Sequence, residues 1–188
     1  MEGRTNWRRR HQDSKKKNYK KEKNSKSKSA FNRKLYEIQK TKEGLSTSFL
    51  LKSLKYLPNF LGVIPQDFLP MLNIKSMPAS FIVNLDFSNK SGSHWIAFGV
   101  FHNHLEIYDS LGLRAKDKPV FILSFLKRFS MTHRIVCTPL LQNPKATTCG
   151  LYCIYFLRFR RMYSLKKCLS IFCSDHSLND RIIFDKLL

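Results

Sequence analysis

The chain has 188 residues, of which 43% are hydrophobic and 13% aromatic, so it can bury the core of one ordinary domain. Its 34 Lys+Arg against 13 Asp+Glu give a formal net charge of +21, which favours acidic partners such as nucleic acid. No run of 18 uncharged apolar residues occurs, and the first thirty residues are basic and polar. We therefore expect neither a membrane span nor a secretory signal.

The five cysteines are an odd number without the spacing of a disulfide framework. This pattern favours reduced thiols in a cytosolic or nuclear setting. The sequence contains no internal repeat and no cofactor-binding loop, so we expect no cofactor. HNH at 102–104 falls in a predicted hairpin turn without a Cys or acidic partner spaced for zinc, so we expect no bound metal ion.

Residues 1–30 contain almost no aliphatic side chains, and the sequence predicts a disordered basic tail there. The clusters RRR, KKK and KK within it fit nuclear import or nucleic-acid contact, although a tail that only aids solubility is the alternative. Residues 45–188 still hold 18 Lys+Arg against 8 Asp+Glu, so the expected domain, residues 31–188, is basic as well.

In chain order, the sequence predicts two helices, then three strands, and then a helix, a strand and two more helices. Helices are predicted at 31–44 and 46–60, strands at 80–88, 93–101 and 104–112, a helix at 118–131, a strand at 133–141, and helices at 148–164 and 176–188. Ser46 is a candidate N-cap, Pro58 ends its helix, and Pro139 places its strand at an edge or at its end. Helices that flank a mostly antiparallel sheet make the fold class α+β.

Three polar residues stand at the ends of these elements. His94 begins the strand at 93–101, Asp109 ends the strand within 104–112, just before Ser110 and Gly112, and Cys149 opens an apolar helix. If the two strands form a hairpin, the carboxylate can hold the imidazole through its Nδ1–H. A helix N-terminus favours the thiolate form of cysteine, so the three residues fit a nucleophile, a base and an orienting acid.

Gln142 adds a fourth component to this set. It lies seven residues before Cys149, in a loop that contains Asn-Pro and can fold back over the helix start. Acyl transfer needs donors aimed at the developing oxyanion, and a side-chain amide and the N–H of Cys149 are candidates. From the residues alone, other interpretations stay open: a histidine without a catalytic role, a turn capped by Asp109, and a cysteine that only fills the core.

The segments GSHWIAFGV (92–100), EIYDSLG (106–112) and QNPKATTCGLYC (142–153) together resemble the adenovirus protease (adenain) and its relatives in viruses and Maverick/Polinton transposons. They are more distantly similar to the proteases that remove SUMO and other ubiquitin-like modifiers. The order His, Asp, Gln, Cys is shared, and the resemblance covers about residues 60–163. The expected fold is therefore that of an adenain-like cysteine protease, with the nucleophile at the start of a central helix.

The resemblance implies roles for four residues: Cys149 as nucleophile, His94 as general base, Asp109 as its orienter and Gln142 as oxyanion donor. It further implies cleavage of Gly-containing sites in capsid or core precursors, stimulation by DNA, and an activating peptide that is joined through a disulfide. Cys137 lies roughly where that disulfide would form, although a buried structural thiol is the alternative. The expected setting is the host nucleus or the virion, and the expected state is a monomer.

Two other functions remain as alternatives. The six residues between Gln142 and Cys149 match the adenovirus spacing, but an aspartate at 109 is more typical of the SUMO proteases. A deconjugating protease is therefore one alternative. A non-catalytic basic DNA-binding protein is the other, with the stretch RFRRMYSLKK (158–167) as a candidate phosphate-contacting face.

Overall fold

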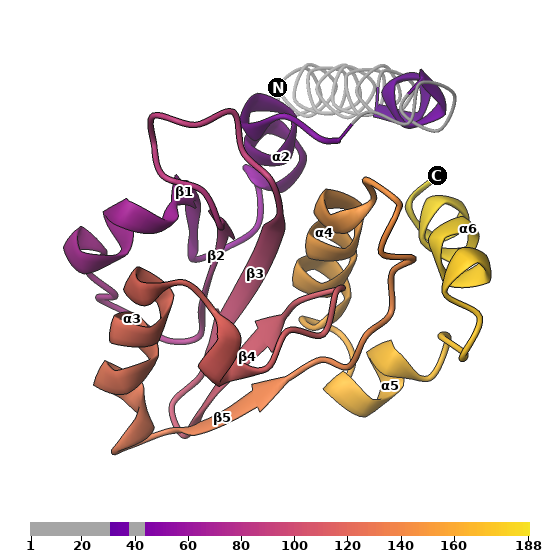
Figure 1. Cartoon of the computed structure of the whole chain (residues 1–188). Coiled ribbons are helices and arrows are strands. Elements are labelled where there is room, and N and C mark those ends of the chain that lie inside the picture. The colour runs from indigo at the N-terminus through magenta and orange to yellow at the C-terminus, as the bar shows by residue number, and fades with distance from the viewer. Residues whose placement is uncertain (1–30, 38–43) are drawn as a thin grey trace, which may run out of the picture. The chain divides into compact units, whose positions relative to one another are not determined.

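The computed structural model describes residues 31–37 and 44–188 (Figure 1). Residues 31–37 are helical, as predicted for that part of the helix at 31–44. The tail predicted over 1–30 lies outside the described residues. Residues 42–187 are assigned to a compact unit that does not include the helix at 31–37. Among the described residues, no helix is both long and apolar enough to cross a bilayer.

The elements of the larger unit agree closely with the predicted order. They are α2 (Thr47–Leu54), β1 (Phe60–Pro65), a 3₁₀ helix (Gln66–Met71), β2 (Ala79–Asn84), β3 (Trp95–Val100), β4 (His104–Tyr108), a second 3₁₀ helix (Ala115–Asp117), α3 (Val120–Ser130), β5 (Arg134–Cys137), α4 (Cys149–Phe159), α5 (Leu165–Leu169) and α6 (His176–Leu187). Ser46 caps α2, since its side chain accepts a hydrogen bond from the N–H of Phe49. The sequence does not predict β1 or α5.

The five strands form one sheet in the order β1-β2-β3-β4-β5. The two central pairs, β2–β3 and β3–β4, are antiparallel, whereas β1 and β5 pair in parallel with their neighbours. The predicted α+β class is confirmed, and the antiparallel pairing holds for the centre of the sheet. β5 is an edge strand, as Pro139 just after it indicated.

Alternation along β3 directs side chains to two different layers. Ile96, Phe98 and Val100 join the core that also contains side chains of α3. Ala97 and Gly99 alternate with them and so face the other side of the sheet, where α4 lies (Figure 1). Because these two residues are so small, the helix can pack closely on the strand. The sheet therefore separates an α3 layer from the layer that contains the central helix.

Candidate active site

The hairpin β3–β4 brings His94 and Asp109 together. His94 immediately precedes β3, Asp109 immediately follows β4, and the strands run antiparallel, so both residues lie at the same end of the pair. The His94 Nε2 atom is 2.8 Å from Oδ1 of Asp109, and both residues are buried. The prediction that the carboxylate would hold Nδ1 is wrong. The ring turns its Nε2 edge to Asp109, which leaves Nδ1 as the nitrogen for another partner.

Asp109 is fixed by contacts on all sides. Its Oδ1 also accepts the N–H of Leu111 at 3.0 Å. The hydroxyl of Thr138 accepts the N–H of Asp109 and donates to its carbonyl, each at 2.8 Å. Its Oδ2 accepts a hydrogen bond from Nζ of Lys118 at 2.5 Å. Sequence reasoning missed Lys118, because a lysine before a proline at the start of a helix is normally exposed.

The electrostatic setting favours a charged imidazole. Burial lowers the pKa of His94, but the hydrogen bond to Asp109 and the contact with the thiol of Cys149 outweigh it and raise the pKa to about 9. Burial raises the pKa of Asp109, but His94 and Lys118 together bring it below its usual value. Near neutral pH the site therefore contains an imidazolium and a carboxylate.

Cys149 is the first residue of α4 and is buried beside His94. The positive end of the helix dipole lies at this position. The N-cap residue, Thr148, does not cap the helix with its side chain. Its hydroxyl donates instead to Oδ1 of Asp180 on α6 at 2.7 Å. The side chain of Thr148 therefore ties the start of α4 to α6 instead of capping the helix.

Gln142 lies in the same region and is held at both ends of its amide. Ser110 donates its hydroxyl proton to Oε1 of Gln142 at 2.7 Å, and Nε2 donates to the carbonyl of Ala146 at 2.6 Å. An amide nitrogen has two N–H donors, so one of them is left after the bond to Ala146. This arrangement fits a donor aimed at a substrate oxygen.

One cleft of about 550 Å³ joins these side chains. It is lined by His94, Gln142 and Cys149 together with Trp95 and residues 44–47. The indole Nε1 of Trp95 donates to the carbonyl of Leu45 at 2.9 Å, which ties the segment before α2 to the wall of the cleft. Three of the four predicted site residues therefore line one cleft, and Asp109 lies buried behind His94.

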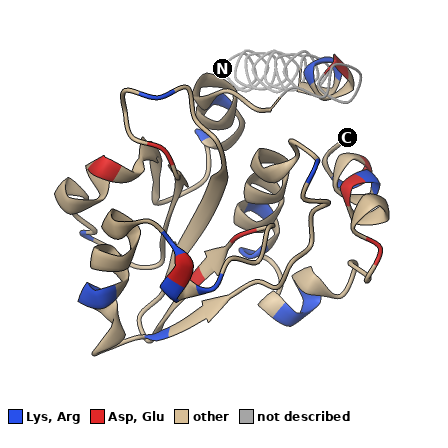
Figure 2. Cartoon of the chain, in the orientation of Figure 1, with Lys and Arg blue, Asp and Glu red and all other residues tan. Residues whose placement is uncertain are grey.

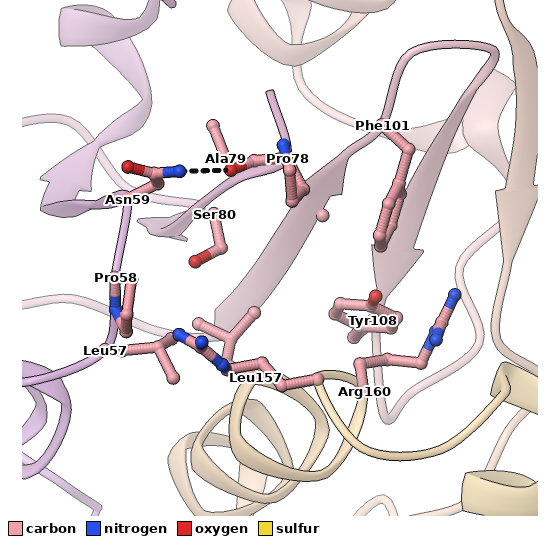
Figure 3. A pocket seen from close by; sticks show the side chains of 12 residues that line it. Leu57, Pro58, Asn59, Pro78, Ala79, Ser80, Phe101, Tyr108, Leu157 and Arg160 are labelled. Atoms are coloured by element: carbon pink, nitrogen blue, oxygen red, sulfur yellow. Dashed lines mark hydrogen bonds between the residues drawn. The ribbon is translucent and has the colours of Figure 1, made fainter. Parts of the chain in front are cut away.

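Another pocket, of about 240 Å³, lies at the far end of α4 (Figure 3). Leu57, Pro58, Phe101 and Leu157 contribute apolar surface to it, and Arg160 borders it. Neither a cysteine nor a histidine lines this pocket. It therefore lacks the cysteine and histidine that line the cleft at the start of α4.

A central helix that begins at a buried cysteine, packed on a sheet that presents a histidine and an acid at one end, defines a cysteine protease. A model of the adenovirus endoprotease family matches residues 60–171, more than half of the chain, and the chain belongs to this family. The resemblance inferred from the motifs is thereby confirmed.

Two solved structures illustrate what the fold is similar to. A protease of ASFV is 18% identical, with a TM-score of 0.46 over 75% of this chain and 67% of that one. The SUMO protease Ulp1, with its catalytic cysteine oxidised to a sulfinic acid, is 14% identical, with a TM-score of 0.42 over 77% and 79%. No curated protein sequence matches the chain.

Proposed function

We propose that the protein is a cysteine endopeptidase in which Cys149 is the nucleophile, His94 the general base and acid, Asp109 the orienting acid and Gln142 an oxyanion donor. The observation that carries the proposal is the position of His94, between the carboxylate of Asp109 and the thiol of Cys149. The contacts of His94 with Asp109 and Cys149 outweigh the cost of its burial and explain why an imidazolium is stable there.

The reaction follows from these positions. The thiolate of Cys149 attacks the scissile carbonyl carbon, and the oxyanion that forms accepts hydrogen bonds from Gln142 Nε2 and the N–H of Cys149. The imidazolium of His94 then gives its proton to the leaving amine nitrogen as the C–N bond breaks, which leaves a thioester on Cys149. Water, deprotonated by His94, attacks the thioester, releases the carboxylic acid and restores the thiolate.

Hydrolysis of Gly-containing peptides by four variants tests this assignment. Cys149→Ala is expected to abolish cleavage, and Gln142→Ala is expected to lower kcat by roughly 10²–10³. His94→Ala is expected to be nearly as damaging as Cys149→Ala, since members of a triad act as a unit. Cys173→Ala is the matched control, because Cys173 is exposed and outside the cleft. Cleavage at the wild-type rate by Cys149→Ala would refute the proposal.

For substrates we propose virion or capsid precursors, cleaved in the host nucleus or the virion with stimulation by DNA. Basic residues support the DNA contact: Lys166 and Lys167 lie on α5, and Arg161 follows α4 (Figure 2). Such contact would be independent of sequence and would weaken steeply with salt. Peptide hydrolysis measured with and without duplex DNA, at low and high salt, tests it.

Deconjugation of a ubiquitin-like modifier is the second candidate, and the aspartate at 109 is the observation that favours it. Whole modifier conjugates and short peptides ending in glycine, compared at equal concentration, separate the two functions. A preference for the whole modifier by several orders of magnitude would decide for deconjugation.

An activating peptide joined through Cys137 is part of the same proposal. Cys137 ends β5 and is half-buried, and burial raises the pKa of its thiol. A raised pKa lowers the thiolate fraction and slows disulfide exchange. The structure therefore supports a peptide disulfide at this position less well than it supports the catalytic set.

A further inference from the structure

Lys118 is a buried lysine next to the proposed catalytic acid. Its side chain is 0% exposed, and its Nζ lies 2.5 Å from Oδ2 of Asp109. It follows the 3₁₀ helix Ala115–Asp117 and stands directly before Pro119 and α3. Lysine is almost never fully buried unless it is paired. A buried ion pair is often no more stabilising than apolar side chains of the same volume, so stability alone does not account for this residue.

The two oxygens of the Asp109 carboxylate have different partners. Oδ1 takes His94 Nε2 and the N–H of Leu111, whereas the hydrogen bond from Lys118 goes to Oδ2. One anion is thus placed between two cations. The ammonium group of Lys118 binds Oδ2 of the carboxylate, and the imidazole of His94 binds Oδ1.

We propose that Lys118 is a positioning residue of the active site. Through Asp109, it holds the carboxylate against the imidazole of His94 and limits how tightly that carboxylate retains the imidazole proton. The inference rests on the proposed function, because it concerns the residue that delivers the proton in that reaction.

The physical reason lies in the charge balance of the site. Asp109 alone would stabilise the imidazolium strongly in this buried setting, and the proton would be released less readily to the leaving amine. The positive charge of Lys118 offsets part of that attraction. The carboxylate thereby orients the ring without making His94 too weak an acid.

Two other titratable groups face this cluster. They are the thiols of Cys137 on β5 and Cys153 on α4, and each is close enough to Asp109 to interact with its charge. Burial raises the pKa of both thiols, so both are neutral near neutral pH. Among the described residues that face the site, these two thiols therefore add no charge to that of Lys118, Asp109 and His94.

The first experiment measures the pKa of His94 directly. The imidazole is titrated by NMR in the full chain carrying Cys149→Ala, with and without Lys118→Met. Loss of the nearby positive charge is expected to raise the His94 pKa by about one unit. Lys116→Met is the matched control, since Lys116 is two residues away and exposed, and it is expected to leave the pKa unchanged. An unchanged or lowered His94 pKa in Lys118→Met would overturn the proposal.

The second experiment measures peptide hydrolysis against pH in the enzyme with an intact Cys149. Lys118→Met is expected to move the alkaline limb of kcat/KM to higher pH and to lower kcat about tenfold, since the imidazolium is a weaker acid. A loss of activity with both limbs unmoved would indicate a structural role only and would overturn the proposal. If no chain shows hydrolysis that depends on Cys149, the proposed function is refuted. The His94 pKa measured by NMR still tests whether Lys118 acts on His94 through Asp109.

A further measurement covers the case in which Lys118→Met does not fold. In the Cys149→Ala chain with native Lys118, the buried lysine is identified by ¹³C labelling as the ammonium group with the slowest proton exchange. Its Cε resonance is expected to shift with the same midpoint as the His94 titration, because both groups share one carboxylate. A Cε resonance that does not respond at that midpoint would contradict the coupling.

Discussion

Gly150, the residue after the proposed nucleophile, has too little room for a Cβ because the side chain of Leu45 packs against it. A Cβ at position 150 would lie 2.9 Å from Cβ, 3.0 Å from Cδ1 and 3.2 Å from Cγ of Leu45. Carbon atoms in contact prefer about 3.5–4.0 Å, so all three approaches are too close. The glycine lets the segment before α2 close over the start of α4, where Trp95 binds the Leu45 carbonyl.

The size of the effect follows from two opposing contributions. Overpacking a core by one methyl group typically costs about 1–3 kcal/mol, and the clash with Cβ of Leu45 is not relieved by rotating the side chain. Alanine gains about 1 kcal/mol over glycine within a helix. Gly150→Ala is therefore expected to lower the free energy of unfolding by about 1 kcal/mol. In a chain that already carries Leu45→Gly, which removes the clashing Cβ as well, the same substitution is expected to raise it by up to about 1 kcal/mol.

Denaturant unfolding of the wild type, both single variants and the double variant gives the coupling energy between the two positions. Leu45→Gly alone is expected to cost at least about 2–5 kcal/mol, because it removes a buried side chain. The Trp95 bond is retained in every variant, since it uses the Leu45 backbone. If the effects of the two substitutions are additive, or if Gly150→Ala is stabilising in the wild-type chain, the packing explanation for the glycine is refuted.

Two further predictions concern acids that tie α4 in place. Glu106 accepts hydrogen bonds from both Nε and Nη2 of Arg160. Burial raises the pKa of Glu106, but Arg160, Tyr108 and His104 together bring it below its ordinary value. The stability that the Glu106 carboxylate contributes is thus present above its ordinary pKa and is lost as the pH falls through the lowered value. Glu106→Gln is expected to make the free energy of unfolding less dependent on acidic pH and to lower it by about 3–5 kcal/mol at pH 7. Asp180→Asn is expected to lower kcat and to cost about 1–3 kcal/mol, measured against Asp185→Asn on the exposed side of the same helix.

Local sequence signals predicted the elements that have strong periodicity or clear caps. The segment before α2 shows Ser46 at the cap, and the apolar run after Cys149 is long enough to be a buried helix. β1 was missed because Gly62, at a φ of 123°, interrupts a run of six residues and shifts the register with β2. α5 was missed because five residues give too little periodicity to recognise.

The site was predicted at the level of residues and not of atoms. Motif order pointed to His94, Asp109, Gln142 and Cys149; three of them line one cleft, and Asp109 lies buried behind His94. Which imidazole nitrogen faces the carboxylate depends on the χ angles of a buried ring, and these follow from the packing of β3 against β4 and α4. The burial of Lys118 likewise depends on contacts between distant segments, and no local pattern encodes it.

The central helix is fixed at both ends, and this explains how one sulfur atom is held in place. At its start, Asp180 accepts hydrogen bonds from Thr148 and Tyr152. At its end, Arg160 is bound by Glu106, which lies on β4, the strand that leads directly into Asp109. The helix that carries the proposed nucleophile is therefore attached to the strand that presents the acid. Substitutions in the α3 layer, on the other face of the sheet, are accordingly expected to lower stability while leaving the pH dependence of hydrolysis unchanged.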